Sequence, residues 1–92
     1  MNLYRQISAE EIEDEINKMY SNALIRSESD QFMVRHAIKM QSRREAKQAI
    51  RKHFSDMKDC SDFYSKVKKL YFALEWVQNG TPVYTDLLRE DD

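Results

Sequence analysis

The chain has 92 residues, of which 41% are hydrophobic and 34% are charged, and its formal net charge at pH 7 is −1. This composition is too apolar for a disordered chain and predicts a single folded domain spanning residues 1–92. One cysteine excludes an internal disulfide, and no apolar run is long enough for a secretion signal or a membrane span, so we expect a cytoplasmic protein without membrane contact.

The only glycine and the only proline lie together in Asn79-Gly80-Thr81-Pro82. The chain before this stretch contains no strong backbone breaker, which favours long helices. We therefore predict an all-α, antiparallel bundle of three long helices, or of four if the second is broken at Ser42. A short C-terminal tail, residues 79–92, is expected to dock on the bundle.

The first helix is predicted over residues 9–26. Ser8 and Glu11 have the spacing of a capping box, and Ile7 and Ile12 that of a hydrophobic staple. Apolar residues then recur at helical period and form the face expected to enter the core. These residues are Ile12, Ile16, Met19, Tyr20, Ala23 and Leu24.

The second helix is predicted over residues 30–57. Its apolar residues between Phe32 and Met40 spread around the helix, which indicates burial on more than one side. Ser42 and Glu45 repeat the capping-box spacing, so a break at Ser42 is the alternative to one continuous helix.

The last helix is predicted over residues 62–78, after a connection at 58–61 in which Asp59 or Ser61 is the cap. Asn79-Gly80 ends it. Phe72 and Trp76 lie one turn apart and away from its main apolar stripe. They are either buried inside a well-wrapped bundle or exposed for a partner, because aromatic residues are enriched at binding hot spots.

The net charge conceals three blocks. Residues 1–30 carry three basic and seven acidic groups, residues 35–69 carry eleven and four, and residues 70–92 carry one and five. The basic block either pairs with the acidic first helix or binds an anionic partner. The candidate partner contacts are Arg43, Arg44, Lys47 and Arg51, and the candidate phosphate contacts are Lys66, Lys68 and Lys69.

Catalytic motifs are weak in this sequence. His36 and His53 have no second ligand at zinc-like spacing, and one glycine cannot build a phosphate-binding loop. Cys60 is interpreted as an incidental thiol in a polar linker surrounded by carboxylates. We predict no enzyme activity, no metal and no cofactor.

Leu3-Tyr4-Arg5 resembles the signature of the LYR-motif proteins, which are small three-helix mitochondrial assembly factors that bind acyl carrier protein. Two fragments, Ile50-Arg51-x-x-Phe54 and Tyr84-Thr85-Asp86-x-Leu88, are also similar to that family. In the family the tripeptide lies inside the first helix, whereas here the capping box follows it. The opening stretch is therefore interpreted as the lead-in to a helix.

The sequence as a whole favours a small non-catalytic binding protein, such as a regulator, inhibitor or adaptor, with a basic and aromatic helical surface. An acidic protein surface is the expected partner, and homo-oligomer formation is an alternative. Nucleic-acid binding through residues 35–69 is the main alternative function. A pI near 6.1 argues against it, since nucleic-acid-binding domains are usually basic overall.

Overall fold

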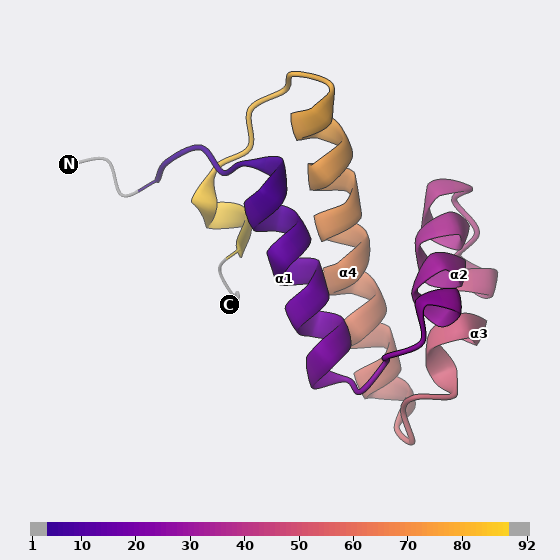
Figure 1. Ribbon diagram of the computed structural model, residues 1–92. Helices are drawn as coiled ribbons and strands as arrows, with labels where there is room; N and C mark the ends of the chain where they lie inside the picture. Colours follow the sequence, from indigo (N-terminus) through magenta and orange to yellow (C-terminus); the bar gives the residue numbers. More distant parts are fainter. Residues whose placement is uncertain (1–3, 89–92) are drawn as a thin grey trace.

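The computed structural model describes residues 4–88 and contains four α-helices within them (Figure 1). They are α1 (Ala9–Asn22), α2 (Glu28–Lys39), α3 (Arg43–Arg51) and α4 (Met57–Gln78), followed by a 3-10 turn, η1 (Thr85–Leu88). The only β-type pairing in this part of the chain is an isolated bridge between Gln6 and Tyr84. The predicted all-α bundle is confirmed in its four-helix form.

The predicted start of α1 is confirmed. The Ser8 side chain accepts from the Glu11 backbone N–H, and the Glu11 carboxylate accepts from the Ser8 backbone N–H at 3.1 Å, which completes the capping box. Arg5 also binds this carboxylate through both terminal nitrogens, at 3.1 and 2.7 Å. Arg5 is thus held against the first turn of α1. Its hydrogen bond lowers the pKa of Glu11 to about 2.

The predicted end of α1 at residue 26 is wrong, because the helix stops at Asn22. Leu24 adopts the left-handed conformation, with φ of 60°, and the Ile25 backbone N–H donates back to the Tyr20 carbonyl at 2.9 Å. This turn buries Ile25, which is 1% exposed, and leaves Leu24 67% exposed. The helix therefore ends in a left-handed turn at a leucine instead of a glycine, and the turn places Ile25 in the core.

The predicted second helix is interrupted at Ser42, so the prediction of one continuous helix over residues 30–57 is wrong. Gln41 has φ of 60°, and the Ser42 backbone N–H donates to the Ala37 carbonyl at 2.8 Å. The Ser42 hydroxyl then accepts from the Glu45 backbone N–H and caps α3. Helix α3 ends at Arg51, whereas the predicted end was residue 57.

The last helix begins at Met57, five residues before the predicted residue 62. Asp56 is its cap, because the Asp56 carboxylate accepts from the Lys58 backbone N–H at 2.8 Å. Residues 58–61 are therefore helical, and their prediction as a connection is wrong. The predicted end at Gln78 is confirmed, with Gly80 at φ of 92° supplying the left-handed turn.

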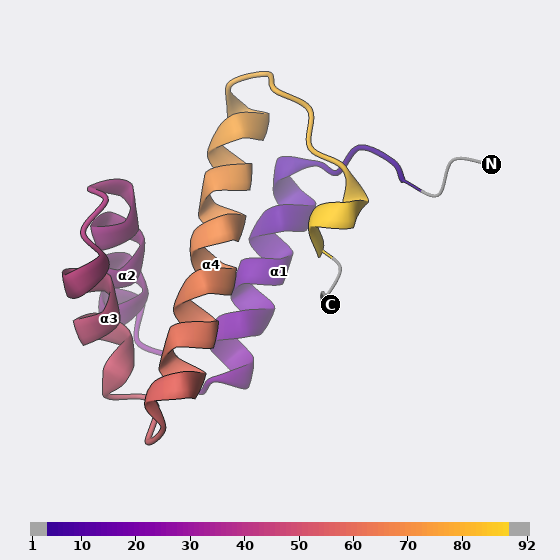
Figure 2. The ribbon, with the colours of Figure 1, turned by 180° about the vertical axis from the view of Figure 1, so that it is seen from behind.

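The helices form two pairs. Antiparallel α1 and α4 lie side by side, while α2 and α3 form a hairpin that packs on α4 mainly through α3 (Figures 1 and 2). The most deeply buried large side chains come from all four helices and from the α1–α2 turn. They are Ile12, Ile25, Ile50, Val34, Val67 and Cys60.

The C-terminal tail docks on the bundle over its described part. Val83 is buried, the Ile7 backbone N–H donates to the Val83 carbonyl, and the Thr85 backbone N–H donates to the Arg5 carbonyl, both at 2.9 Å. Residues 89–92 of the predicted tail lie outside the described residues. Within residues 4–88, no helix combines the length and apolarity needed to span a membrane.

Candidate protein-binding surface

The outer face of α4 carries Lys68, Phe72 and Trp76, which are spaced one helical turn apart on the side opposite the core. Trp76 is 51% exposed, so the alternative that buried it inside the bundle is wrong. Phe72 is half-buried. An exposed tryptophan beside a half-buried phenylalanine offers a partner a large apolar contact on a rigid helix.

Two lysines converge on one aromatic ring beside this stripe. The Lys47 ammonium from α3 and the Lys68 ammonium from α4 lie 5.9 and 5.6 Å from the centroid of the Tyr64 ring. Lys68 also lies 5.8 Å from the centroid of the Phe72 ring, and Lys47 donates to the Ser61 hydroxyl at 3.0 Å. We call these five side chains, Lys47, Tyr64, Lys68, Phe72 and Trp76, the α4 surface.

Within the described residues, no carboxylate neutralises the positive charge of the α4 surface. Among residues 4–88, neither Lys47 nor Lys68 forms an ion pair with a carboxylate. Aromatic rings hold both ammonium groups through cation–π contacts instead. The two ammonium groups therefore remain able to bind an anionic group that approaches from solvent.

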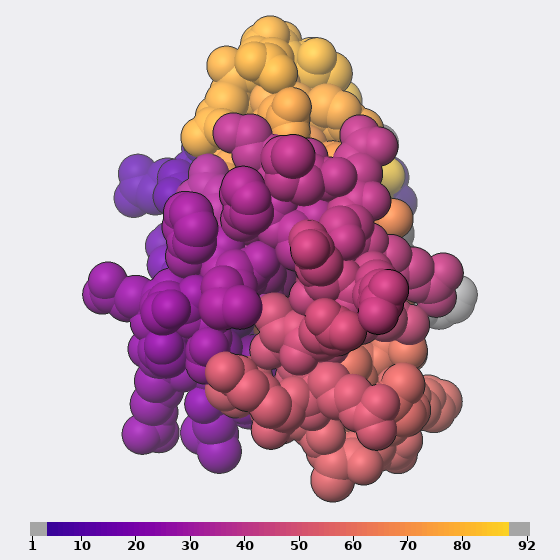
Figure 3. Space-filling view, turned by 90° about the vertical axis from the view of Figure 1, so that its right-hand side faces the viewer, coloured from indigo at the N-terminus to yellow at the C-terminus, as the bar shows by residue number. Residues whose placement is uncertain are grey.

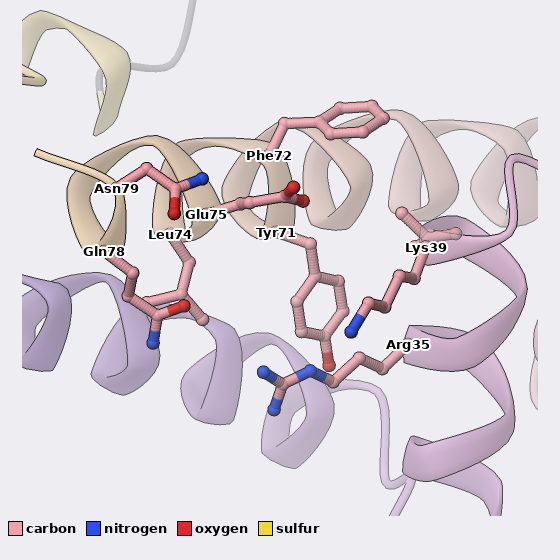
Figure 4. A pocket seen from close by; sticks show the side chains of 9 residues that line it. Arg35, Lys39, Tyr71, Phe72, Leu74, Glu75, Gln78 and Asn79 are labelled. Atoms are coloured by element: carbon pink, nitrogen blue, oxygen red, sulfur yellow. The ribbon is translucent and has the colours of Figure 1, made fainter. Parts of the chain in front are cut away.

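A shallow cleft of about 170 Å³ adjoins Phe72, between α2 and the C-terminal half of α4 (Figure 4). Arg35 and Lys39 reach into it from α2, and Tyr71 extends from α4 toward Arg35. The Arg35 guanidinium lies 5.6 Å from the centroid of the Tyr71 ring. Glu75 also lines the cleft but forms no ion pair with either cation.

The floor of this cleft rests on a pair of tyrosines. The hydroxyls of Tyr71 and Tyr20 are 2.7 Å apart and share a hydrogen bond. Burial raises the pKa of both tyrosines.

The predicted contact residues do not form one continuous surface. Arg44 and Arg51 are exposed, and helical spacing places them on the face of α3 opposite its buried Ala46, Ala49 and Ile50. Arg43 is also exposed and lies one turn before Lys47 on the same side of α3. Lys66 and Lys69 instead line a separate cleft between α4, α1 and η1, which also contains Glu15, Asp59 and Asp62.

The acidic first helix does not neutralise the partner contacts predicted in the basic block. In the part of the chain that the structure describes, the ion pairs of α1 join Glu11 to Arg5 and Glu15 to Lys18. No ion pair there joins α1 to Arg43, Arg44, Lys47 or Arg51. The internal-pairing alternative is therefore wrong for these four residues.

The residues considered for catalysis have structural contacts. Cys60 is buried at the start of α4, with its thiol 3.9 Å from the Lys47 carbonyl, so its prediction as part of a polar linker is wrong. His53 lies 3.2 Å from the Asp30 carboxylate, which Lys52 also binds at 2.8 Å. Within residues 4–88, no group of three His, Cys, Asp or Glu side chains is placed to hold a metal.

The sequence reasoning missed a second exposed apolar face, on α2. The sequence pattern predicts burial of Phe32, Met33 and Met40, yet they are 67%, 51% and 64% exposed. The apolar residues spread around this helix were the available signal. Such a spread is typical of an external contact as well as of burial on two sides.

Comparisons with known proteins return no relatives. No protein-family model matches the chain, no curated protein matches it, and no solved structure matches its fold.

Proposed function

We propose that this chain is a non-catalytic binding protein whose α4 surface docks an acidic patch on a partner protein. The observation that carries the proposal is the convergence of Lys47 and Lys68 on the Tyr64 ring, on the same side of α4 as the exposed Trp76, which lies two helical turns beyond Lys68. Both cations lack a carboxylate partner among residues 4–88. A regulator, inhibitor or adaptor would use such a surface.

The chemistry of the α4 surface favours a protein with carboxylates next to apolar groups. Trp76 and Phe72 provide the apolar area typical of a hot spot, and the Lys68 ammonium lies at the Phe72 end of it. The rings restrict both lysines before binding, which lowers the conformational entropy lost when a carboxylate reaches them. Charge complementarity of this kind also selects against basic partners.

A peptide-display selection tests the proposal even while the natural partner is unidentified. The immobilised wild-type protein is panned against a random-peptide library, and the enriched peptides are then tested for binding to the Lys68→Ser/Trp76→Ser variant. Lys69→Ser is the matched control, since Lys69 lies on the same helix but lines a different cleft. We expect enriched peptides with carboxylates flanking aromatic or aliphatic residues, which bind wild type and Lys69→Ser but not the double variant.

Two results would contradict the proposal. One is enrichment of peptides that bind the double variant as well as they bind wild type. The other is enrichment without any excess of acidic residues. Circular dichroism of each variant establishes that the helices are intact, so that a loss of binding reports on the surface.

A further inference from the structure

The outer face of α2 is apolar and open to solvent. Phe32, Met33 and Met40 are all at least half-exposed, and helical spacing places them with His36 on one side of the helix. The Phe32 ring stacks on the His36 ring, with centroids 5.7 Å apart and planes inclined by 10°. We call these four side chains the α2 face.

This face is additional to the one that α2 contributes to the core. Val34, Ala37 and Ile38 are buried against the rest of the bundle. A helix with apolar residues on both sides is normally covered on both sides, because each exposed large apolar side chain forgoes the free energy of burial. Within residues 4–88 nothing covers the α2 face, so it is available to a binding partner.

Cations border the α2 face along both edges. Arg35 and Lys39 lie along one edge, and the outward row of Arg44 and Arg51 follows the neighbouring α3, so that α2 and α3 together form this side of the molecule (Figure 3). None of these four cations forms an ion pair within residues 4–88. The nearby Asp30 already binds Lys52 and His53. The exposed carboxylate of Glu28 is at the N-terminal end of α2.

We infer that the α2 face docks an acidic amphipathic helix of another protein. The apolar side of that helix packs on Phe32, Met33 and Met40, and its flanking carboxylates reach the cations on both edges. Methionine suits such a contact, because its unbranched side chain adapts to the shape of the ligand. This site shares no residue with the α4 surface, although its edge cations Arg35 and Lys39 line the cleft that adjoins Phe72.

A second copy of this chain is disfavoured on the α2 face when the two α2 helices pack antiparallel. A twofold contact between two antiparallel α2 helices places α3 against α3, so Arg44 and Arg51 of one copy meet the same residues of the other. The acidic helix α1 lacks an exposed apolar side, since its Ile12 and Ile16 are buried in its own core. Charge and shape together favour a different protein.

Methyl NMR on methionine-labelled full-length protein tests the inference. Met33 and Met40 report on the α2 face, and Met57, which is 50% exposed at the start of α4, is the control. The probe is a synthetic helix of leucine and glutamate with its leucines along one side, compared with a scrambled peptide of the same composition. The Trp76 indole N–H signal reports separately on the α4 surface.

We expect saturable shifts of the Met33 and Met40 methyl signals with the amphipathic peptide, and none at Met57. Arg44→Glu should weaken this binding about fivefold, while Lys69→Glu leaves it unchanged. Unmoved Met33 and Met40 signals would overturn the inference, as would equal shifts with the scrambled peptide. Shifts on concentrating the protein alone would also overturn it, because they would identify a second copy as the occupant.

Discussion

The hydroxyl of Tyr20 on α1 lies 2.7 Å from the hydroxyl of Tyr71 on α4, and this hydrogen bond joins the two long helices beneath the α2–α4 cleft. Arg35 of α2 lies over the Tyr71 ring on the solvent side. The tyrosine pair thus links the core to the candidate binding region. Its disruption should affect stability first, while the exposed Trp76 remains in place.

Replacement of Tyr71 by phenylalanine should lower the free energy of unfolding by about 1 kcal/mol, because the buried Tyr20 hydroxyl loses its short hydrogen bond. Urea denaturation followed by circular dichroism measures the change. Tyr84→Phe is the control, since the Tyr84 side chain is 44% exposed, and it should leave stability unchanged. A Tyr71→Phe protein as stable as wild type would show that the pair contributes nothing.

The same pair predicts a loss of stability at high pH. The folded pKa of Tyr20 and of Tyr71 is raised above the ordinary value of 10.0, so the stabilisation from the protonated hydroxyls is complete below that pH. It declines as the pH rises above it, because the unfolded chain ionises more readily. Above pH 10, the free energy of unfolding of the Tyr20→Phe/Tyr71→Phe variant should therefore decrease less per pH unit than that of wild type.

The lowered pKa of Glu11 leads us to expect a loss of stability at acidic pH. Its folded pKa of about 2 is below the ordinary value of 4.5, so its contribution is present above pH 4.5 and is lost as the pH falls toward 2. Glu11→Gln should flatten the decrease in stability over that interval. Glu13→Gln, an exposed position on the same helix, should retain the wild-type slope. If the free energy of unfolding fell equally with pH in all three proteins, the Arg5–Glu11 pair would be shown to be weak in solution.

Leu24→Gly should stabilise the protein by up to about 1 kcal/mol. Glycine removes the left-handed backbone strain at φ of 60°, and this gain exceeds the added entropy of the unfolded chain. Little packing is lost, since Leu24 is 67% exposed. The neighbouring Ala23 has φ of −89°, so Ala23→Gly should destabilise the protein instead. Thermal unfolding of the two variants would give shifts of opposite sign.

The sequence predicts the starts of α1 and α3 better than their ends. Side-chain caps are visible as residue types, as with Ser8 and Ser42, whereas the left-handed turns at Leu24 and Gln41 fall on residue types that do not favour that conformation. Asp56 was missed because Asp59 and Ser61 are equally good caps by type.

Exposure was the other limit of sequence reasoning. The sequence shows that Trp76 lies away from the main apolar stripe of α4. Whether Trp76 is buried depends on where the α2–α3 hairpin packs. The same uncertainty concealed the α2 face, since Phe32 and Met40 have the residue types of a core. Convergence of Lys47 and Lys68 on one ring requires α3 and α4 to be placed in three dimensions.

Nucleic-acid binding predicts a different electrostatic response. Fluorescence anisotropy of labelled mixed-sequence DNA and RNA at about 50 and 200 mM salt would reveal phosphate contacts as a fall in affinity of orders of magnitude. We expect no such binding, because the candidate phosphate contacts are divided between two surfaces. Lys66 and Lys69 line a cleft that also contains carboxylates, whereas Lys68 lies beside Tyr64 and Phe72. Tight binding with a steep salt dependence would assign the basic residues to phosphate recognition.

The most direct test of the α4 surface is the dissociation constant of a selected acidic peptide for three proteins of equal helicity: wild type, Trp76→Ser and Lys69→Ser. We predict that Trp76→Ser binds about thirtyfold more weakly than wild type, as expected for a central aromatic hot spot, and that Lys69→Ser binds equally well. Equal affinity of all three proteins would show that the peptide does not use the α4 surface and would contradict the proposed function.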